Sequence, residues 1–162
     1  MKNFLVNTNY VVPKRFCKCK KKTINFVNNA VEIIKQNPDL SNAELFELLS
    51  KNENSNQYYI IYSTKPSQKG VLLYHGADSF VSQSDMCGDE KPPVGQNLWN
   101  YKSLNGLYAV RVFYKIAEQK SRGWFSYYWV NSKGKISPKY DYIVNIPERN
   151  FFISSGFYIN CC

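Results

Sequence analysis

The sequence predicts an α+β domain in which N-terminal helices pack on an antiparallel sheet that includes one crossover helix. Apolar residues between positions 24 and 49 recur every three or four residues, as on the buried side of helices. Segments rich in β-branched and aromatic residues follow from position 58 onward. One further segment of helical period, residues 105–120, interrupts them. At 162 residues the chain fits a single domain with a substantial core.

Two helices are expected before the sheet. The first begins at Thr23, which can cap a helix, and places its apolar stripe on Ile24, Val27, Val31 and Ile34. Asn37-Pro38-Asp39 ends it. Ser41 and Glu44 then have the spacing of a capping box, so a second short helix is predicted from about Asn42.

The predicted strands alternate with turn residues. Residues 58–62 and 71–74 form a hairpin through the turn sequence of residues 65–70. Residues 75–96 are polar and contain glycine and proline, which predicts a long irregular connection, a type of segment that commonly contributes to a site. After the crossover helix, three segments predict a strand meander: residues 124–130, 140–146 and 151–159.

The net charge of +9 is concentrated at the N-terminus. Residues 1–22 hold seven bases and no acid, which leaves 14 bases, 12 acids and a net charge of +2 for the rest of the chain. We therefore predict a flexible basic arm over residues 1–22 and a single ligand-binding domain over residues 23–162. The arm favours contact with an anionic surface, either a membrane through residues 14–22 or a nucleic acid, although the nearly neutral body argues against nucleic acid.

The cysteines predict no disulfide framework, because the chain contains five of them. Cys17 and Cys19 could meet Cys161 and Cys162 in a four-thiolate zinc site, but the ligand spacing is unusual and lysines lie between. Reduced surface thiols are the favoured interpretation, and no metal is expected. The sequence also shows no apolar run long enough to span a bilayer and no secretory signal, so a cytoplasmic location is expected from the chain as written.

Catalysis is not predicted. His75 is the only histidine, and no phosphate-binding glycine loop, paired histidines or nucleophile elbow is present. Asp89 and Glu90 are adjacent in a polar segment, where carboxylates are usually solvated. The sequence therefore indicates a binding protein without a cofactor.

The aromatic strand at residues 124–130 has two interpretations. Alternation sends Phe125, Tyr127 and Trp129 to one face, and Trp124, Ser126, Tyr128 and Val130 to the other. The strand is either a central strand covered on both faces, or it contributes Tyr127 and Trp129 to the wall of a ligand cavity.

Lys139 is a charged residue within strand-forming sequence. Alternation places Lys139, Asp141 and Ile143 on one face, and Tyr140, Tyr142 and Val144 on the other. Sequence physics alone favours a lysine at the rim with its ammonium group in water. The alternative is an ammonium group that receives an anionic ligand within a concave sheet.

Five segments in order resemble the single Cache family of sensor domains. They are Gly95-Gln96-Asn97-Leu98, Asn105-Gly106-Leu107-Tyr108, Gly123 to Trp129, Pro138-Lys139-Tyr140-Asp141-Tyr142 and Ser155-Gly156-Phe157-Tyr158-Ile159. The resemblance covers roughly residues 23–160. It implies a long N-terminal helix packed on a curved, antiparallel, five- to six-stranded PAS-like sheet with one crossover helix.

The resemblance also implies a function. Cache domains sense small ligands outside the cytoplasmic membrane, often short-chain carboxylates, and signal to a chemoreceptor or kinase. The residues expected to line the pocket are Tyr127, Trp129, Lys139 and Tyr142, with His75 and Arg111 as further candidates. The prediction is thus a non-catalytic sensor for a small organic anion, whose signalling partner the sequence does not identify. The alternative is a protein that binds nucleic acid or an anionic membrane through its basic arm.

Overall fold

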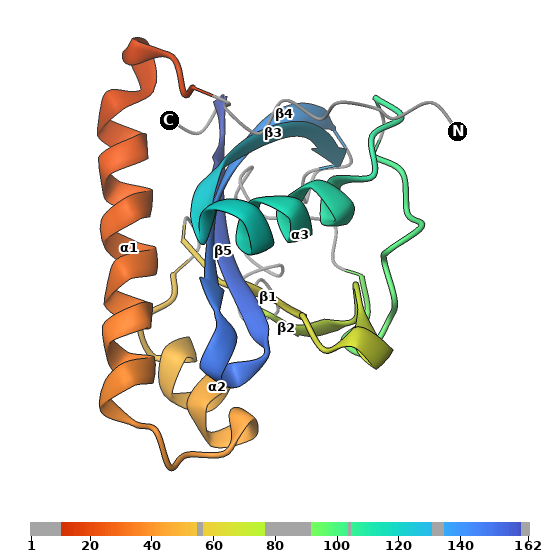
Figure 1. The fold of residues 1–162 in the computed structure, drawn as a ribbon. Helices are drawn as coiled ribbons and strands as arrows, with labels where there is room; N and C mark the ends of the chain where they lie inside the picture. The colour runs from red at the N-terminus through yellow and green to blue at the C-terminus, as the bar shows by residue number, and fades with distance from the viewer. Residues whose placement is uncertain (1–10, 55–56, 77–91, 104, 131–134, 160–162) are drawn as a thin grey trace.

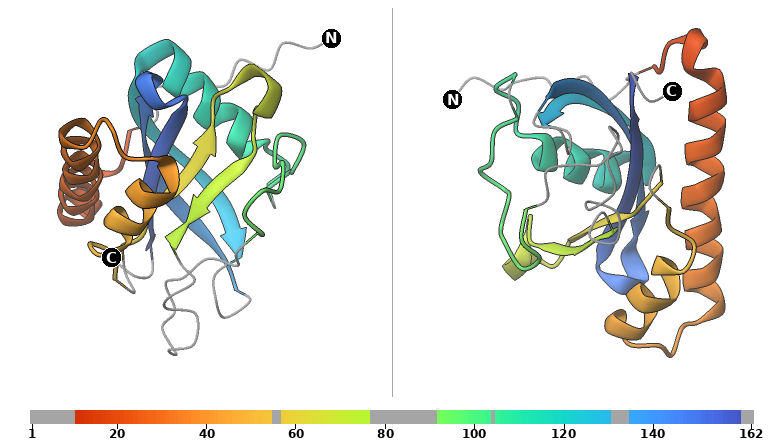
Figure 2. Two further views of the ribbon diagram at one scale, coloured as in Figure 1. Left: turned by 90° about the horizontal axis from the view of Figure 1, so that it is seen from below. Right: turned by 180° about the vertical axis from the view of Figure 1, so that it is seen from behind.

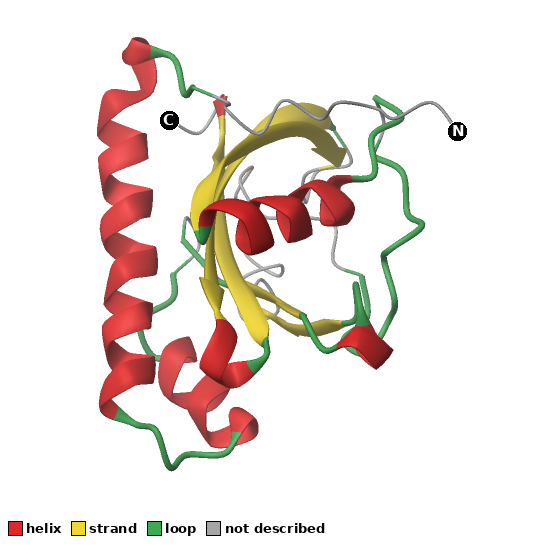
Figure 3. Ribbon diagram, viewed as in Figure 1, coloured by secondary structure: helices red, strands yellow, loops and turns green. Residues whose placement is uncertain are grey.

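The chain folds into one antiparallel sheet with helices on both faces, as seen in a computed structural model that describes residues 11–54, 57–76, 92–103, 105–130 and 135–159. Helices α1 and α2 lie against one face of the sheet, and α3 crosses the other (Figures 1 and 2). Figure 3 separates these layers by secondary structure. The α+β class and PAS-like architecture expected from the sequence are confirmed.

Helix α1 spans Cys17–Gln36 and follows a short 3₁₀ turn, η1, at Lys14–Phe16. It therefore starts before Thr23, and the basic residues 14–22 lie in η1 and the first turns of α1 rather than in a separate flexible arm. Val12 and Phe16 are buried in the same core cluster as Val27 and Ile34, which fixes this end of the chain on the domain. Lysine and arginine have good helix propensity, so a basic run can continue a helix whose other side is apolar.

Helix α2 spans Asn42–Ser50 and has the predicted capping box. The Ser41 hydroxyl accepts a hydrogen bond from the Glu44 amide, and the Glu44 carboxylate accepts one from the Ser41 amide. Both contacts satisfy donors that a helix N-terminus leaves free.

The sheet has the strand order β2-β1-β5-β4-β3. Its strands are β1 (Ile60–Ser63), β2 (Leu72–His75), β3 (Arg122–Val130), β4 (Ile136–Ile146) and β5 (Phe151–Tyr158). The predicted hairpin is β1–β2, and the predicted meander is β3–β4–β5. The aromatic strand β3 lies at the edge of the sheet, so it is not a central strand; β5 occupies the centre.

Each face of the sheet supports its own hydrophobic core. On one face, residues of α1 and α2 pack on side chains such as Tyr59, Ile153 and Tyr142. On the other, α3 (Ala109–Lys120) packs through Phe113 and Ile116 on Phe125 and Ile143. The predicted irregular connection after His75 lies largely outside the described residues, as do Cys87, Cys161 and Cys162.

Candidate functional site

Strand register brings polar residues of β4 together with aromatic residues of β3 and β5 on the sheet face that carries α3. Lys139 pairs with Tyr127 on one side and with Tyr158 on the other. Asp141, two residues further along β4, pairs with Phe125 and with Gly156. Because directly paired residues point to the same face of a sheet, these side chains converge.

The centre of this group is an ion pair between two fully buried side chains. Lys139 is 1% exposed and Asp141 is 0% exposed. The Lys139 Nζ lies 3.6 Å from the Asp141 Oδ1. Removing two charges from water is costly even when they are paired, so such a pair within a small domain points to a function beyond packing. Lys139 is thus not a rim residue with its ammonium group in water.

Tyr127 and Gly156 fix the position of the Asp141 carboxylate. The Tyr127 hydroxyl donates a hydrogen bond of 2.6 Å to Asp141 Oδ2. At Gly156, a Cβ would stand only 1.7 Å from Asp141 Oδ1. The carboxylate therefore occupies the space that a side chain at position 156 would need, so only glycine fits at this position.

Aromatic rings surround the Lys139 ammonium group. Its Nζ lies 5.4 Å from the ring centroid of Tyr58 and 5.7 Å from that of Tyr158, both within the range of cation–π attraction. Tyr58 in turn stacks on the imidazole of His75, with centroids 5.5 Å apart. His75 is buried at the end of β2, so two distant parts of the chain meet at this point. We call Lys139, Asp141, Tyr127, Tyr58, Tyr158 and His75 the Lys139 cluster.

Trp129 lies at the border of the Lys139 cluster. It is half-buried, its ring lies 5.9 Å from that of Tyr127, and the ring of Tyr101 lies 5.2 Å away on its other side. Tyr101 is 49% exposed. The rings of Tyr101, Trp129 and Tyr127 therefore lie in a row from the protein surface to the hydrogen bond between Tyr127 and Asp141.

Tyr142 does not join the residues with which it was predicted to act. It lies on the opposite face of β4, in the core beneath α1, with its ring 5.1 Å from that of Trp124. The period-two alternation of a strand already separates Tyr142 from Lys139, whereas the family resemblance suggested that both line one pocket. The structure follows the alternation, so a packing role is the simplest account of Tyr142.

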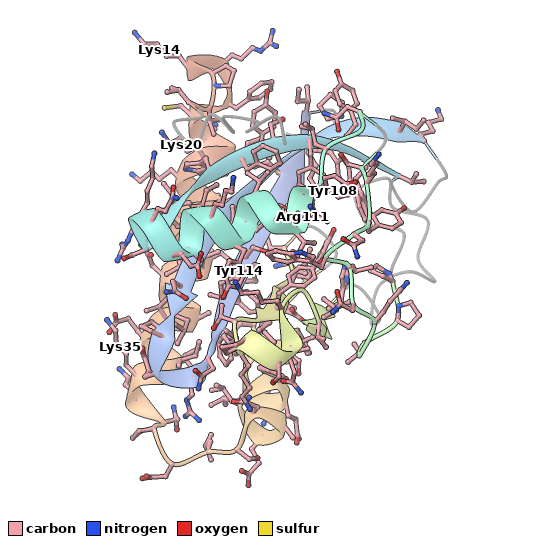
Figure 4. The ribbon with its side chains drawn as sticks, turned by 45° about the vertical axis from the view of Figure 1, so that its right-hand side comes forward. Lys14, Lys20, Lys35, Tyr108, Arg111 and Tyr114 are labelled. Carbon is pink, nitrogen blue, oxygen red and sulfur yellow. The ribbon has the colours of Figure 1, made fainter. Side chains whose placement is uncertain are left out.

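Arg111 organises the segment that precedes α3. Its Nε donates a hydrogen bond of 2.8 Å to the Trp99 carbonyl, its guanidinium group also contacts Asn100, and it lies 4.0 Å from the ring centroid of Tyr108. Figure 4 shows Arg111 beside Tyr108 at the N-terminal end of α3. These contacts tie Trp99, Asn100 and Tyr108 to the helix, and they give Arg111 a supporting role outside the Lys139 cluster.

Four residues of this region were not predicted as site residues from the sequence: Asp141, Tyr58, Tyr158 and Gly156. For Asp141 the signal was present, because alternation put it on the same face as Lys139. Tyr158 comes from β5, the next strand of the predicted meander, whereas Tyr58 precedes β1 and is far from Lys139 in the sequence, so no local pattern reveals its contact. Lys139, Tyr127 and His75 are the predicted residues that the structure does bring together.

A half-buried carboxyl group, that of Glu53, lies on the other side of the sheet. Glu53 Oε1 accepts a hydrogen bond from the Tyr59 amide and Oε2 accepts one from the Tyr74 hydroxyl, both at 2.7 Å. Burial outweighs these two contacts and raises the pKa of Glu53 to about 7. Among the described residues, no group of three or more metal-binding side chains occurs here or elsewhere.

Comparison with known proteins identifies a family for the chain. The family model for the Cache domain matches residues 17–161. Three solved structures have the same fold with low sequence identity. One is a methyl-accepting chemotaxis protein from Vibrio parahaemolyticus, with a TM-score of 0.71 at 19% identity over 91% of this chain and 93% of that one.

The other two structures are sensor domains. A periplasmic sensor domain of a chemotaxis protein has a TM-score of 0.68 at 14% identity, over 91% of this chain and 99% of its own. A Cache chemosensory domain described in terms of carboxylic acid recognition has a TM-score of 0.64 at 16% identity, over 92% and 99%. The cytoplasmic location expected from the chain as written is not supported by these matches. No helix in the described part of the chain has the length and apolar character of a membrane span.

Proposed function

The chain belongs to the family of Cache domains, ligand-sensing modules of the kind found in chemotaxis receptors, and we propose that it senses a small organic molecule with a carboxylate group at the Lys139 cluster. The observation that carries this proposal is the buried Lys139 side chain, 1% exposed, whose ammonium group lies near the rings of Tyr58 and Tyr158. A desolvated ammonium group binds a carboxylate more strongly than an exposed one does. The similar domain described in terms of carboxylic acid recognition supports the same ligand class.

The proposed module binds its ligand without transforming it. Cache domains are sensory and non-catalytic. In the Lys139 cluster the ammonium group and the carboxylate neutralise each other, and the hydroxyl of Tyr127 is already engaged with Asp141. Neither the ion pair nor the Tyr127 hydrogen bond provides a base next to a nucleophilic side chain, which covalent or general-base catalysis would need. The site is therefore suited to recognition.

A ligand-binding experiment tests the proposal. We expect a panel of small carboxylic acids and amino acids to contain a compound that raises the melting temperature by about 5–10 °C at 100 times its Kd. In the double variant Lys139→Met/Asp141→Asn, which removes both charges together, this response should disappear. Lys65→Met, at an exposed lysine in the β1–β2 connection, is the matched control and should respond as the wild type does. An unchanged response in the double variant, or none in the wild type, would contradict the proposal.

The proposed location of the domain is outside the cytoplasm. One similar structure is a periplasmic sensor domain, and Cys19 is disulfide-bonded here. Disulfides persist mainly in oxidising compartments. A membrane-impermeant thiol reagent applied to intact cells checks this location, because it should label the free and exposed Cys17.

A second candidate interaction involves the basic residues of η1 and α1. Lys14, Arg15, Lys18, Lys21 and Lys22 are exposed, and no acidic residue lies among them. Figure 4 shows Lys14 and Lys20 toward one end of α1 and Lys35 at the other. Phe16 is buried against Tyr140, so this region offers no stacking platform for nucleic acid bases, and we propose an anionic membrane surface as the partner. Cosedimentation with vesicles that contain anionic lipid should fall sharply in Lys18→Gln/Lys21→Gln/Lys22→Gln and remain in Lys35→Gln.

A further inference from the structure

We propose that exposed apolar side chains of β3 and β4 insert into the surface of an anionic lipid bilayer, beside the basic residues of η1 and α1. This inference rests on the membrane contact proposed above and adds an apolar component to it. It starts from Tyr128 and Ile136, which are 44% and 59% exposed although both lie within strands. Single exposed apolar residues are common, whereas a contiguous group of them marks an interaction surface.

Strand pairing makes these two side chains part of one patch. Tyr128 pairs with Pro138 and Ile136 pairs with Val130, and directly paired residues point to the same face of a sheet. Pro138 and Val130 are half-buried. Alternation places all four on the face that carries α1, because Tyr140, two residues after Pro138, belongs to the core on that face. We call Tyr128, Val130, Ile136 and Pro138 the β3–β4 patch.

The β3–β4 patch begins next to the basic residues of η1. The ring of Phe16 packs on that of Tyr140 with centroids 5.8 Å apart, and Tyr140 pairs with Ser126, two residues before Tyr128. The Arg15 guanidinium group lies 4.9 Å from the ring centroid of Phe16. Figure 1 shows η1 and the strands β3 and β4 at the same end of the molecule. A single flat surface can therefore contact both the apolar patch and the bases.

The charge around the β3–β4 patch identifies the partner that fits it. Neither residues 11–22 nor residues 122–138 contain an acidic residue. Lys14, Arg15 and Lys135 are exposed. An anionic bilayer offers negative charge to these bases and an apolar interior to the patch, and tyrosine is favoured at the boundary between the two. A second copy of this chain would bring like charges together, so a bilayer is the better match.

Cosedimentation of the whole chain with vesicles tests the apolar component. The vesicles contain phosphatidylcholine alone or phosphatidylcholine with phosphatidylglycerol. We expect the wild type to prefer the anionic vesicles, and Tyr128→Gln/Ile136→Gln to bind them about tenfold more weakly, because two apolar side chains no longer leave water. The matched control is Val94→Gln. It changes an exposed apolar residue beside β2, at the other edge of the sheet, and should bind as the wild type does.

Salt dependence and insertion depth give two further readouts. Added salt should weaken the binding of the wild type to anionic vesicles but leave a residual affinity that Tyr128→Gln/Ile136→Gln lacks, because salt screens charges and not apolar contacts. In Ile136→Trp, brominated lipids in the anionic vesicles should quench the fluorescence of the added indole. In Val94→Trp the quenching should not exceed that of the wild type.

The possible results distinguish the apolar component from the membrane contact itself. Equal binding of the wild type and Tyr128→Gln/Ile136→Gln to anionic vesicles, with no added quenching in Ile136→Trp, would overturn this inference alone. A wild type that binds no vesicles would overturn the proposed membrane contact as well. Self-association of the wild type without vesicles, measured by sedimentation equilibrium and abolished in Tyr128→Gln/Ile136→Gln, would assign the patch to a second copy of the chain and would also overturn the inference.

Discussion

At the scale of single residues, the tightest steric requirement of the site falls on Gly156. A Cβ at this position would stand 1.7 Å from Asp141 Oδ1 and 2.4 Å from the Tyr140 carbonyl oxygen, and a strand backbone cannot move away from its neighbour. We expect Gly156→Ala to lower the free energy of unfolding by about 3 kcal/mol and to weaken ligand binding. Urea denaturation measures the first effect.

Gly123→Ala is the matched control for Gly156→Ala. Gly123 is also a strand glycine, but its Cβ would meet a single atom, the Cγ2 methyl group of Ile116, at 2.9 Å. Since this contact is longer and involves neither a carboxylate nor the backbone, the expected loss in the free energy of unfolding is smaller, about 1 kcal/mol. Equal losses in the free energy of unfolding of the two variants would contradict the steric conflict expected between a Cβ at position 156 and the Asp141 carboxylate.

Glu53 makes the stability of the fold depend on pH. Its pKa is raised to about 7, mainly by burial, from an ordinary value of 4.5. Between these two values the folded protein keeps a proton that the unfolded chain releases, so the stability falls as the pH rises through this window and the loss is complete above pH 7. The loss amounts to about 3 kcal/mol.

Glu53→Gln should remove this dependence. The amide fits the same position between the Tyr59 amide and the Tyr74 hydroxyl, and it carries no charge. We expect the variant to match the wild type near pH 4.5 and to exceed it in free energy of unfolding at pH 8, as measured by urea titration at each pH. Parallel pH profiles for Glu53→Gln, the wild type and the exposed control Glu32→Gln would refute the assignment.

Residue-scale prediction from sequence worked where strand alternation was sufficient. Alternation separates Tyr142 from Lys139 and joins Asp141 to it, and the structure agrees on both points. The burial of Lys139 was not predictable in the same way. Tyr158 reaches it from the neighbouring strand of the predicted meander, but Tyr58 precedes β1 and is far from Lys139 in the sequence.

At the scale of elements, Arg149 connects the β4–β5 turn to the connection between α1 and α2. It lies in η4 (Pro147–Arg149), and its guanidinium group donates hydrogen bonds of 2.7 Å to the Leu40 carbonyl and 2.6 Å to the Asn37 carbonyl. Arg149→Met leaves both acceptors without this donor. We expect a loss of about 2 kcal/mol in the free energy of unfolding, measured by urea denaturation.

A lysine in place of Arg149 should recover only part of this loss, because its single ammonium group cannot reproduce the two-pronged geometry. Arg122→Met, at an exposed position where β3 begins, is the control and should leave stability almost unchanged. If Arg149→Met were as neutral as Arg122→Met, the hydrogen bonds from Arg149 would not contribute measurably to the stability of the fold.

Most elements were predictable because their signals are local. The capping box of α2 and the turn that separates β4 from β5 follow from residue types at fixed spacing. The start of α1 was misplaced for a physical reason. Its basic residues suggested a solvated arm, whereas Val12 and Phe16 anchor that segment to the core.

At the scale of the whole molecule, the order β2-β1-β5-β4-β3 determines the site, and no local pattern specifies it. The pairing of β1 with β5 joins residues 60–63 to residues 151–154 and so brings Tyr58 and His75 toward Lys139. The family resemblance implied an antiparallel PAS-like sheet, but it gave no prediction of this strand order.

The cysteines make it possible to test whether the stability of the protein depends on oxidising conditions. Reduced thiols were expected, but Cys19 on α1 is disulfide-bonded, whereas Cys17 is free and exposed. A disulfide restricts the unfolded chain and typically contributes about 2–4 kcal/mol. We expect a reductant to lower the melting temperature of the wild type by about 5–10 °C.

The two neighbouring cysteines of α1 supply a variant and its control. Cys19→Ser should melt at the temperature of the reduced wild type and be insensitive to reductant, whereas Cys17→Ser should behave as the wild type does under both conditions. A melting temperature that reductant does not change in any of the three proteins would count against a stabilising disulfide and against the oxidising compartment proposed from it. A loss of stability on reduction would support the proposed location outside the cytoplasm, because the disulfide at Cys19 would persist only in an oxidising compartment.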